Sequence, residues 1–384
     1  MNKICIITDS LKNNGYLTPL ITMLKADEAV SLTVLSTDRY KSDDIELNFT
    51  CVEDQGSAAD ESLEIFVNPG GAHKREKSAD EEQRAYAAAF NAIDPEIVVL
   101  FGNSISTFSA AVAAFLNNIP VAHIQGGESD YGVPDDAYGF GITKIANLHF
   151  TATETYRKRV TGFGEHPDRV FNVGSLAAYN LLSRKIPDKE DFCMSMGMDP
   201  ADEFIFISMV PDRSIGSRNA ALMQSLTDAL ENPKYDAFKL VAENPGESGF
   251  GQIMKRQLDR LVNQYPGRVI FIKDEDQIPA AMTHCRAVAG NSDRCVVDAA
   301  TLRTPVVSVG QRLKDRENPG HMIPAAMVAD FISHALDKAL CPSFKIKLMF
   351  MDSPFEQPGT PDAIKAVLQA YTPADIAAKT QYNG

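Results

Sequence analysis

The stretch HIQGGESDYGVPDDAYGFGITKIANLHFTATETYRKRVTGFGEHPDRVFNVGS, residues 123–175, sets out a strand end, a glycine turn, an acidic loop and a helix in that order. The apolar run Pro120–Ile124 leads into it and predicts a buried strand. Gly126-Gly127 then permits either a tight turn or a close approach of the backbone to a ligand. This order is typical of an α/β unit that carries a ligand site at the end of a strand.

The paired Asp135-Asp136 follows Pro134 and precedes the expected helix. An aspartate at this position commonly caps a helix by accepting hydrogen bonds from its first N–H groups. Either carboxylate could instead transfer protons to a ligand held above the turn. Both interpretations remain open from the residues alone.

Short apolar runs alternate with helical patterns along the rest of the chain, which indicates parallel sheets covered on both faces. The pattern restarts after a turn-prone join near Ser183–Asp191. We therefore expect an α/β protein with two Rossmann-like domains, residues 1–182 and 183–384, that face a ligand cleft, with the last helix returning to the first domain. The expected strands are Ile4–Ile7, Leu32–Leu35, Ile97–Phe101, Pro120–Ile124, Phe204–Ser208, Phe238–Val241, Val269–Ile272, Ala287–Ala289 and Pro305–Val309.

A second informative stretch, GNSDRCVVDAATLRTPVVSVGQRLKDRENPG, covers residues 290–320. Its first turn, Gly290-Asn291-Ser292, is either a phosphate cradle of backbone N–H groups and a hydroxyl or an ordinary turn between a strand and a helix. Arg312, Lys314 and Arg316 follow the next expected strand, where they could clamp a phosphate or simply be solvated surface charges.

The composition limits the classes of partner. The net charge of −14 argues against a nucleic-acid ligand, which requires a basic surface. No segment approaches the roughly 18 apolar residues of a membrane span, and the first residues lack a signal-peptide pattern. The six cysteines are scattered without metal-binding spacing, as in reduced cytoplasmic proteins. We expect a cytoplasmic protein without a metal or cofactor.

Several motifs together carry a resemblance to a known family. They are GGE, the Asp pair, ITKIANLHFTATETYRKRV, GEHPDRVFNVGS, and the later GNS and GQR. In order and spacing the chain closely resembles the hydrolysing UDP-N-acetylglucosamine 2-epimerases of sialic- and legionaminic-acid biosynthesis. The resemblance implies a fold of glycosyltransferase-B type, UDP or a UDP-sugar as ligand, and a homodimer or homotetramer. Such enzymes eliminate UDP across C1–C2 of the sugar and then add water to the glycal.

The resemblance also implies roles for individual residues. Asp135 matches the family's catalytic acid, and Glu128 and Asp136 match other members of its acidic loop. Asp298 stands at the position of a ribose-binding glutamate and is one methylene shorter. The residues that match the nucleotide site are Gly290, Ser292, Asp298, Arg312 and Arg316.

The residues that differ from the family pattern lie at positions to which the resemblance assigns substrate binding or catalysis. The residues expected to line the substrate pocket are Lys12, Asn103, Gln125 and Val210. At Leu11, next to Lys12, the family has an arginine. At Asn103 it has an aspartate, at Gln125 an acid or a histidine, and at Val210 a histidine. A family Arg-His pair is here Gly139-Phe140, and its second phosphate-turn serine is Asp293.

Three functions are compatible with this pattern. The first is a nucleotide-sugar enzyme with altered substrate or chemistry, the second a non-catalytic paralogue that binds a ligand or partner in the same pathway, and the third a glycosyltransferase-like activity. Binding of UDP and release of free UDP without an acceptor distinguish them, because fold alone does not determine function.

Overall fold

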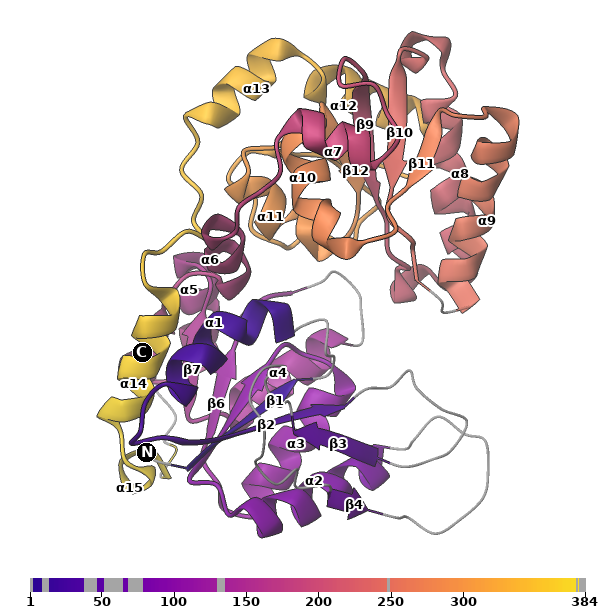
Figure 1. The fold of residues 1–384 in the computed structure, drawn as a ribbon. Coiled ribbons are helices and arrows are strands. Elements are labelled where there is room, and N and C mark those ends of the chain that lie inside the picture. Colours follow the sequence, from indigo (N-terminus) through magenta and orange to yellow (C-terminus); the bar gives the residue numbers. More distant parts are fainter. Residues whose placement is uncertain are drawn as a thin grey trace. The chain divides into compact units, whose positions relative to one another are not determined.

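The structure is a computed structural model that describes residues 3–8, 14–37, 47–51, 65–67, 79–129, 135–246, 249–377 and 379. The chain divides into two compact units (Figure 1). Unit 1 comprises Met1–Glu128, Asp135–Asn180 and Gln357–Gly384, and unit 2 comprises Ser129–Pro134 and Leu181–Glu356. Within the described part of the chain, no helix is long and apolar enough to cross a membrane.

Unit 1 contains an eight-stranded sheet in the order β4-β3-β2-β1-β5-β6-β7-β8. Strands β3 and β4 pair antiparallel at one edge, and the other six strands are parallel. The strand order reverses between β1 and β5, where Ile4 pairs with Ile97. The strands are β1 (Lys3–Thr8), β2 (Ser31–Thr37), β3 (Leu47–Cys51), β4 (Ile65–Val67), β5 (Ile97–Phe101), β6 (Val121–Ile124), β7 (Leu148–Thr151) and β8 (Val170–Asn172).

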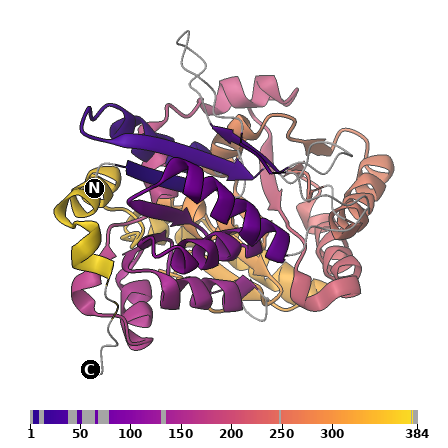
Figure 2. The same cartoon turned by 90° about the horizontal axis from the view of Figure 1, so that it is seen from below.

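Helices cover both faces of this sheet because successive residues of each apolar strand point to opposite faces. Ile4 and Ile6 pack with residues of α1 and α14, whereas Cys5 and Ile7 pack with α2 and α3. Figure 2 shows the purple helices α2 and α3 side by side over one face. The helices are α1 (Asn14–Lys25), α2 (Ala79–Ile93), α3 (Ile105–Leu116), α4 (Asp135–Ile145), α5 (Glu154–Gly162), α6 (Leu176–Ser183), α14 (Thr360–Ala370) and α15 (Pro373–Ala377).

The end of the chain is part of the core of unit 1. Helix α14, yellow in Figure 1, lies beside the indigo α1. Ile364 and Leu368 of α14 are fully buried in the same cluster as Leu17, Leu20 and Leu24 of α1. Unit 1 is therefore assembled from the first and last parts of the chain.

Unit 2 contains a six-stranded sheet, all parallel, in the order β11-β10-β9-β12-β13-β14. Counted along the chain this is the order 3-2-1-4-5-6 of the Rossmann fold, in which the direction of winding reverses between the first and fourth strands. The strands are β9 (Glu203–Ser208), β10 (Phe238–Ala242), β11 (Val269–Phe271), β12 (Ala287–Gly290), β13 (Val306–Val309) and β14 (Met322–Ala325).

The core of unit 2 lies on both faces of this sheet. Ile205 and Ile207 of β9 pack against α8, α9 and α12. Phe204 points to the opposite face, where its ring lies 5.6 Å from that of Phe192 on α7. The helices are α7 (Lys189–Ser195), α8 (Asn219–Leu230), α9 (Gly249–Gln264), α10 (Ile278–His284), α11 (Val297–Thr301), α12 (Ala329–Ala339) and α13 (Pro342–Met349).

Candidate functional site

The point in unit 2 where the strand order reverses, called the switch point below, lies between β9 and β12. Ser208, the last residue of β9, pairs with Gly290, the last residue of β12. Parallel sheets bind ligands at the carboxyl ends of their strands at such a point. Val210 follows β9, and its N–H and C=O bond the side-chain amide of Asn291 at 2.8 and 2.9 Å. The structure thus brings Gly290 and Val210 together at one edge.

Gly290 allows β12 to approach β9 closely. A Cβ atom at this position would lie 2.1 Å from the carbonyl oxygen of Ser208. That oxygen instead accepts hydrogen bonds from the N–H groups of Asn291, at 3.0 Å, and Ser292, at 3.3 Å. Two N–H groups that the sequence suggested for an anion are therefore used to join the turn to β9.

Behind the turn lies a network of hydroxyl and carboxyl groups that sequence reasoning missed. The Ser292 and Ser208 hydroxyl oxygens are 2.5 Å apart, and the Ser208 hydroxyl donates to the carboxyl group of Glu243, which follows β10. Burial raises the pKa of Glu243, against the attraction of the nearby Arg294. The sequence signal was that the buried run of β9 ends in Ser208 and that Glu243 directly follows the run of β10.

Asp298 lies on α11 beside this network. The Arg294 guanidinium donates to its carboxylate at 3.4 Å and lies 3.8 Å from the Glu243 carboxylate. Burial raises the pKa of Asp298, although Arg294 opposes the shift. Asp298 is thus a buried carboxyl group within reach of the switch point, and its expected contact with a ribose stays a prediction.

Arg312 and Arg316 lie on the loop after β13 and are not solvated surface charges. Their side chains are only 12% and 5% exposed. Arg312 donates to the Asn291 carbonyl oxygen at 2.8 Å, and both arginines bond the carboxylate of Asp293. The two loop arginines and the turn after β12 therefore form one cluster.

In unit 1 the expected pocket residues Asn103 and Gln125 follow the neighbouring strands β5 and β6. Gln125 has φ 71°, a left-handed conformation that costs energy in a non-glycine residue and often occurs at functional sites. Gly139 on α4 lies beside Asn103, since a Cβ there would be 3.2 Å from the Asn103 Cβ. Glycine at this position thus lets α4 approach Asn103 closely, and a larger side chain there would crowd Asn103.

The structure describes the acidic residues of unit 1 only in part. Asp135 and Asp136 open helix α4, and Glu128 lies two residues before the next undescribed segment. Lys12 and Leu11 lie outside the described residues, and the side chain of Asp135 is not described. The acid–base roles of these carboxylates stay predictions.

A buried histidine supports the turn that bears Asn103. His123 Nε2 lies 2.9 Å from the carbonyl oxygen of Gly102. Burial lowers the pKa of His123 to about 4, with the bond to Gly102 opposing the shift. The ring is therefore neutral at pH 7, and its Nε2–H is the donor in this bond.

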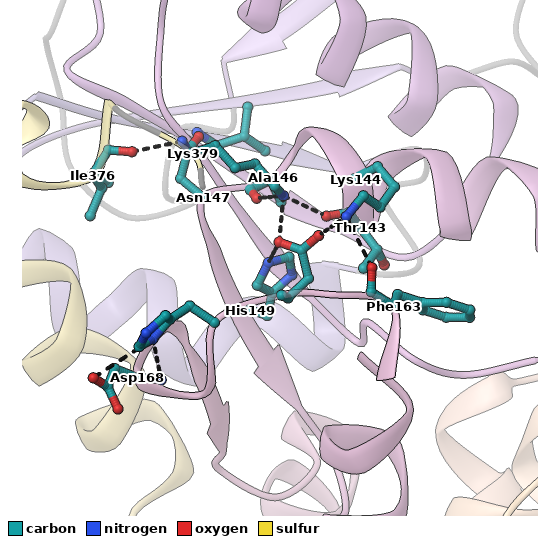
Figure 3. Close-up of polar contacts among 12 residues, drawn as sticks. Thr143, Lys144, Ala146, Asn147, His149, Phe163, Asp168, Ile376 and Lys379 are labelled. Atoms are coloured by element: carbon teal, nitrogen blue, oxygen red, sulfur yellow. Dashed lines mark hydrogen bonds and ion pairs between the residues drawn. The ribbon is translucent and has the colours of Figure 1, made fainter. Parts of the chain in front are cut away.

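A second buried polar cluster in unit 1 surrounds Glu165. Figure 3 shows Lys144, His149 and Lys379 converging on one point. The carboxylate of Glu165, only 4% exposed, lies 2.7 Å from Lys144, 3.2 Å from His149 and 2.6 Å from Lys379. Lys379 also donates to the Thr143 carbonyl oxygen at 2.9 Å. The cluster fastens the end of the chain to α4 and β7.

Replacing Glu165 with glutamine is expected to destabilise unit 1 by about 1–3 kcal/mol, because this buried carboxylate holds two lysines that would lose their anion. Burial raises the pKa of Glu165, but hydrogen bonds from His149, Lys144 and Lys379 outweigh it and hold the pKa at about 2, below its ordinary 4.5. The contribution is therefore present above pH 4.5 and is lost as the pH falls toward 2. Urea unfolding at several pH values measures both effects.

The control for this variant is Glu154→Gln. Glu154 is 49% exposed and pairs with Arg157 on the same helix at 3.2 Å, so its loss should cost at most about 0.5 kcal/mol. Equal stability losses in the two variants at pH 7 would contradict the role assigned to Glu165.

The comparisons with known proteins agree with this architecture. The family model described as UDP-N-acetylglucosamine 2-epimerase matches residues 24–369. The chain belongs to this family. The UDP-N-acetylglucosamine 2-epimerase family thus accounts for both units, and neither the paralogue nor the glycosyltransferase alternative is favoured by the comparisons.

Two relatives from this family span most of the chain. Polysialic acid biosynthesis protein P7 of Escherichia coli is 27% identical over 317 residues, covering 82% of this chain and 80% of that protein. The hydrolysing GDP/UDP-N,N'-diacetylbacillosamine 2-epimerase of Campylobacter jejuni is 24% identical over 345 residues, covering 89% and 88%.

Solved structures show the same fold. UDP-GlcNAc 2-epimerase from Neisseria meningitidis, bound to UDP-GlcNAc, has a TM-score of 0.75 at 17% identity, over 96% of this chain and 100% of that one. The S. aureus MnaA–UDP co-structure has a TM-score of 0.76 at 14% identity, with 100% of both chains covered. At these identities the likeness supports the two-domain α/β fold of the family.

Proposed function

We propose that this protein is a hydrolysing nucleotide-sugar 2-epimerase whose substrate is a UDP-sugar other than UDP-N-acetylglucosamine. The observation that carries the proposal is the cluster at the switch point of unit 2, within a chain of this family. There Ser292, Asp298, Arg312 and Arg316 occupy the edge at which Rossmann-type sheets bind nucleotides. Relatives and structural neighbours named for UDP or UDP-sugars support the choice of ligand.

The proposed nucleotide site uses these groups by their chemistry. The guanidinium groups of Arg312 and Arg316 have the geometry to hold phosphate oxygens, and the Ser292 hydroxyl can bond another. The Asp298 carboxyl group can accept hydrogen bonds from ribose hydroxyls. Gly290 keeps the turn close to β9.

The proposed reaction begins with an elimination. A base removes the proton on C2 of the sugar, the bond from C1 to the diphosphate oxygen breaks, and a C1=C2 double bond forms as UDP leaves. Water then adds a hydroxyl to C1 and a proton to the opposite face of C2. These steps require a positioned acid–base group and stabilisation of the departing diphosphate.

The side chains proposed to line the sugar pocket limit which groups can transfer protons. Asn103 and Gln125 can bond sugar hydroxyls but do not exchange protons near neutral pH, and Val210 supplies only an apolar wall. Proton transfer is therefore proposed for Asp135, with Asp136 next to it in sequence and Glu128 earlier in the acidic loop. Lys12 is proposed to face the diphosphate. The changed pocket is the reason for proposing a changed sugar.

A panel of UDP-sugars tests the proposal, with UDP release and free sugar measured together. We expect no detectable conversion of UDP-N-acetylglucosamine to N-acetylmannosamine, and turnover of another member such as UDP-N,N'-diacetylbacillosamine. Efficient turnover of UDP-N-acetylglucosamine would refute the changed specificity. Binding without turnover of any sugar would support a non-catalytic paralogue, and transfer only to an added acceptor would support a glycosyltransferase.

The assembly and location of the protein are also part of the proposal. By family resemblance we propose a homodimer or homotetramer in the cytoplasm, with no nucleic-acid or membrane partner. Light scattering of the purified protein measures its oligomeric state directly.

A further inference from the structure

Asp293 bears the carboxylate that faces the two loop arginines of unit 2. It opens the three-residue 3-10 turn Asp293–Cys295, directly after Ser292. One terminal nitrogen of Arg312 lies 3.0 and 3.3 Å from its two carboxylate oxygens, and a nitrogen of Arg316 lies 3.1 Å from one of them. Both guanidinium groups therefore share a single anion that belongs to the chain itself.

The exposure of these groups differs in a way that bears on ligand binding. The Arg312 and Arg316 side chains are 12% and 5% exposed, whereas the Asp293 side chain is 59% exposed. The carboxylate thus lies between two buried guanidinium groups and solvent. Any anion that reaches these guanidinium groups from solvent meets Asp293 first.

The turn that carries Asp293 is held at both ends. Arg312 donates to the carbonyl oxygen of Asn291 at 2.8 Å, and His321 Nε2 lies 2.8 Å from the carbonyl oxygen of Cys295. His321 is fully buried and burial lowers its pKa to about 4, so the ring is neutral and its Nε2–H donates. The position of Asp293 is therefore part of a fixed framework.

Arg294, next to Asp293 in the chain, also faces carboxylates. Arg294 lies 3.4 Å from Asp298 and 3.8 Å from Glu243. The guanidinium groups at this edge thus each face carboxyl groups of the chain. A diphosphate that arrives would add negative charge to a cluster that already holds its own anions.

We propose that Asp293 is a resident anion at the phosphate position, and that it weakens binding of diphosphates by occupying Arg312 and Arg316. The proposal rests on the proposed function for the identity of the ligand. A UDP-sugar gains the two guanidinium groups only by displacing Asp293, and the released UDP is held weakly. Protonation of Asp293 does not relieve this competition near neutral pH, because Arg312 and Arg316 outweigh the partial desolvation of its carboxylate and hold its pKa at about 2.

Calorimetry at fixed ionic strength tests the proposal with pyrophosphate, uridine and UDP. The wild-type protein should bind UDP more weakly than roughly 1 μM. Asp293→Asn should bind pyrophosphate and UDP at least tenfold more tightly, since the amide keeps the shape but not the charge, and uridine affinity should not change. Asp352→Asn, which removes an exposed carboxylate of the same unit outside this cluster, is the matched control and should leave all three affinities unchanged.

Asp293→Ser is a second variant that removes the carboxylate, in case the asparagine still bonds the arginines. Pyrophosphate affinity that is unchanged or undetectable in both folded variants would overturn the proposal, and so would sub-micromolar UDP binding by the wild-type protein. Tighter pyrophosphate binding without any binding of UDP or UDP-sugars would support the resident anion and refute the proposed function. Turnover of a UDP-sugar with no change in pyrophosphate affinity would do the reverse.

Discussion

Replacing Asp135 with asparagine is expected to lower turnover of the accepted UDP-sugar by at least a hundredfold while its binding stays nearly unchanged. Losing one acid–base group typically costs about 10²–10⁴ in rate. Asparagine is similar in size and bonds sugar hydroxyls, but it cannot exchange a proton near neutral pH. Steady-state kinetics together with calorimetry on the variant measure the two effects separately.

The asparagine variant also separates the two interpretations of this residue. Asparagine caps a helix about as well as aspartate, so a purely structural Asp135 would tolerate the change. Asp188→Asn is the matched control, because Asp188 caps α7 by accepting from the Asp191 N–H at 2.9 Å. Full turnover by Asp135→Asn would show that this carboxylate is not the catalytic acid.

Replacing Gly290 with alanine is expected to destabilise unit 2 by about 3 kcal/mol or more. The added Cβ would lie 2.1 Å from the Ser208 carbonyl oxygen and 2.9 Å from the Cys295 sulfur. The obstructing oxygen is backbone, so β12 must move away from β9 and the turn after it must shift. Urea unfolding followed by circular dichroism suits a chain that lacks tryptophan.

Gly249→Ala is the control for this variant. Gly249 begins α9 in the same unit, and a Cβ there meets nothing within 4 Å. Alanine should change stability there by no more than about 1 kcal/mol, in the stabilising direction. If Gly290→Ala unfolded at the same urea concentration as the wild type, the close approach of β9 and β12 would be wrong.

Much of the fold could be predicted from local pattern. The runs Ile97–Phe101 and Phe204–Ser208 are buried along almost their whole length, because parallel strands covered on both faces need apolar residues at every position. The antiparallel strands Leu47–Cys51 and Ile65–Val67 were not predicted. They lie at one end of the sheet, with β4 outermost, and their pairing depends on neighbouring strands rather than on a continuous apolar run.

The candidate site was predicted less completely, for a physical reason. Ser292 and Arg312 follow recognisable strands, so their positions at the sheet edge could be inferred. The contact between Ser208 and Ser292 joins residues 84 positions apart, and it depends on β9 and β12 being adjacent. The sequence showed that Asp293 replaces a serine of the family's phosphate turn, but its pairing with both loop arginines depends on side-chain geometry that spacing does not contain.

The discontinuous make-up of unit 1 bears on how the chain acquires its structure during synthesis. Ile364, Leu368 and Ile376 share a buried cluster with Leu17 and Leu20, and all of unit 2 is translated between these two groups. The ribosome therefore releases a complete unit 2 before unit 1 can close its core. Until then the apolar side of α1 lacks its final covering, and a nascent chain that stalls after unit 2 would expose that surface to chaperones and proteases.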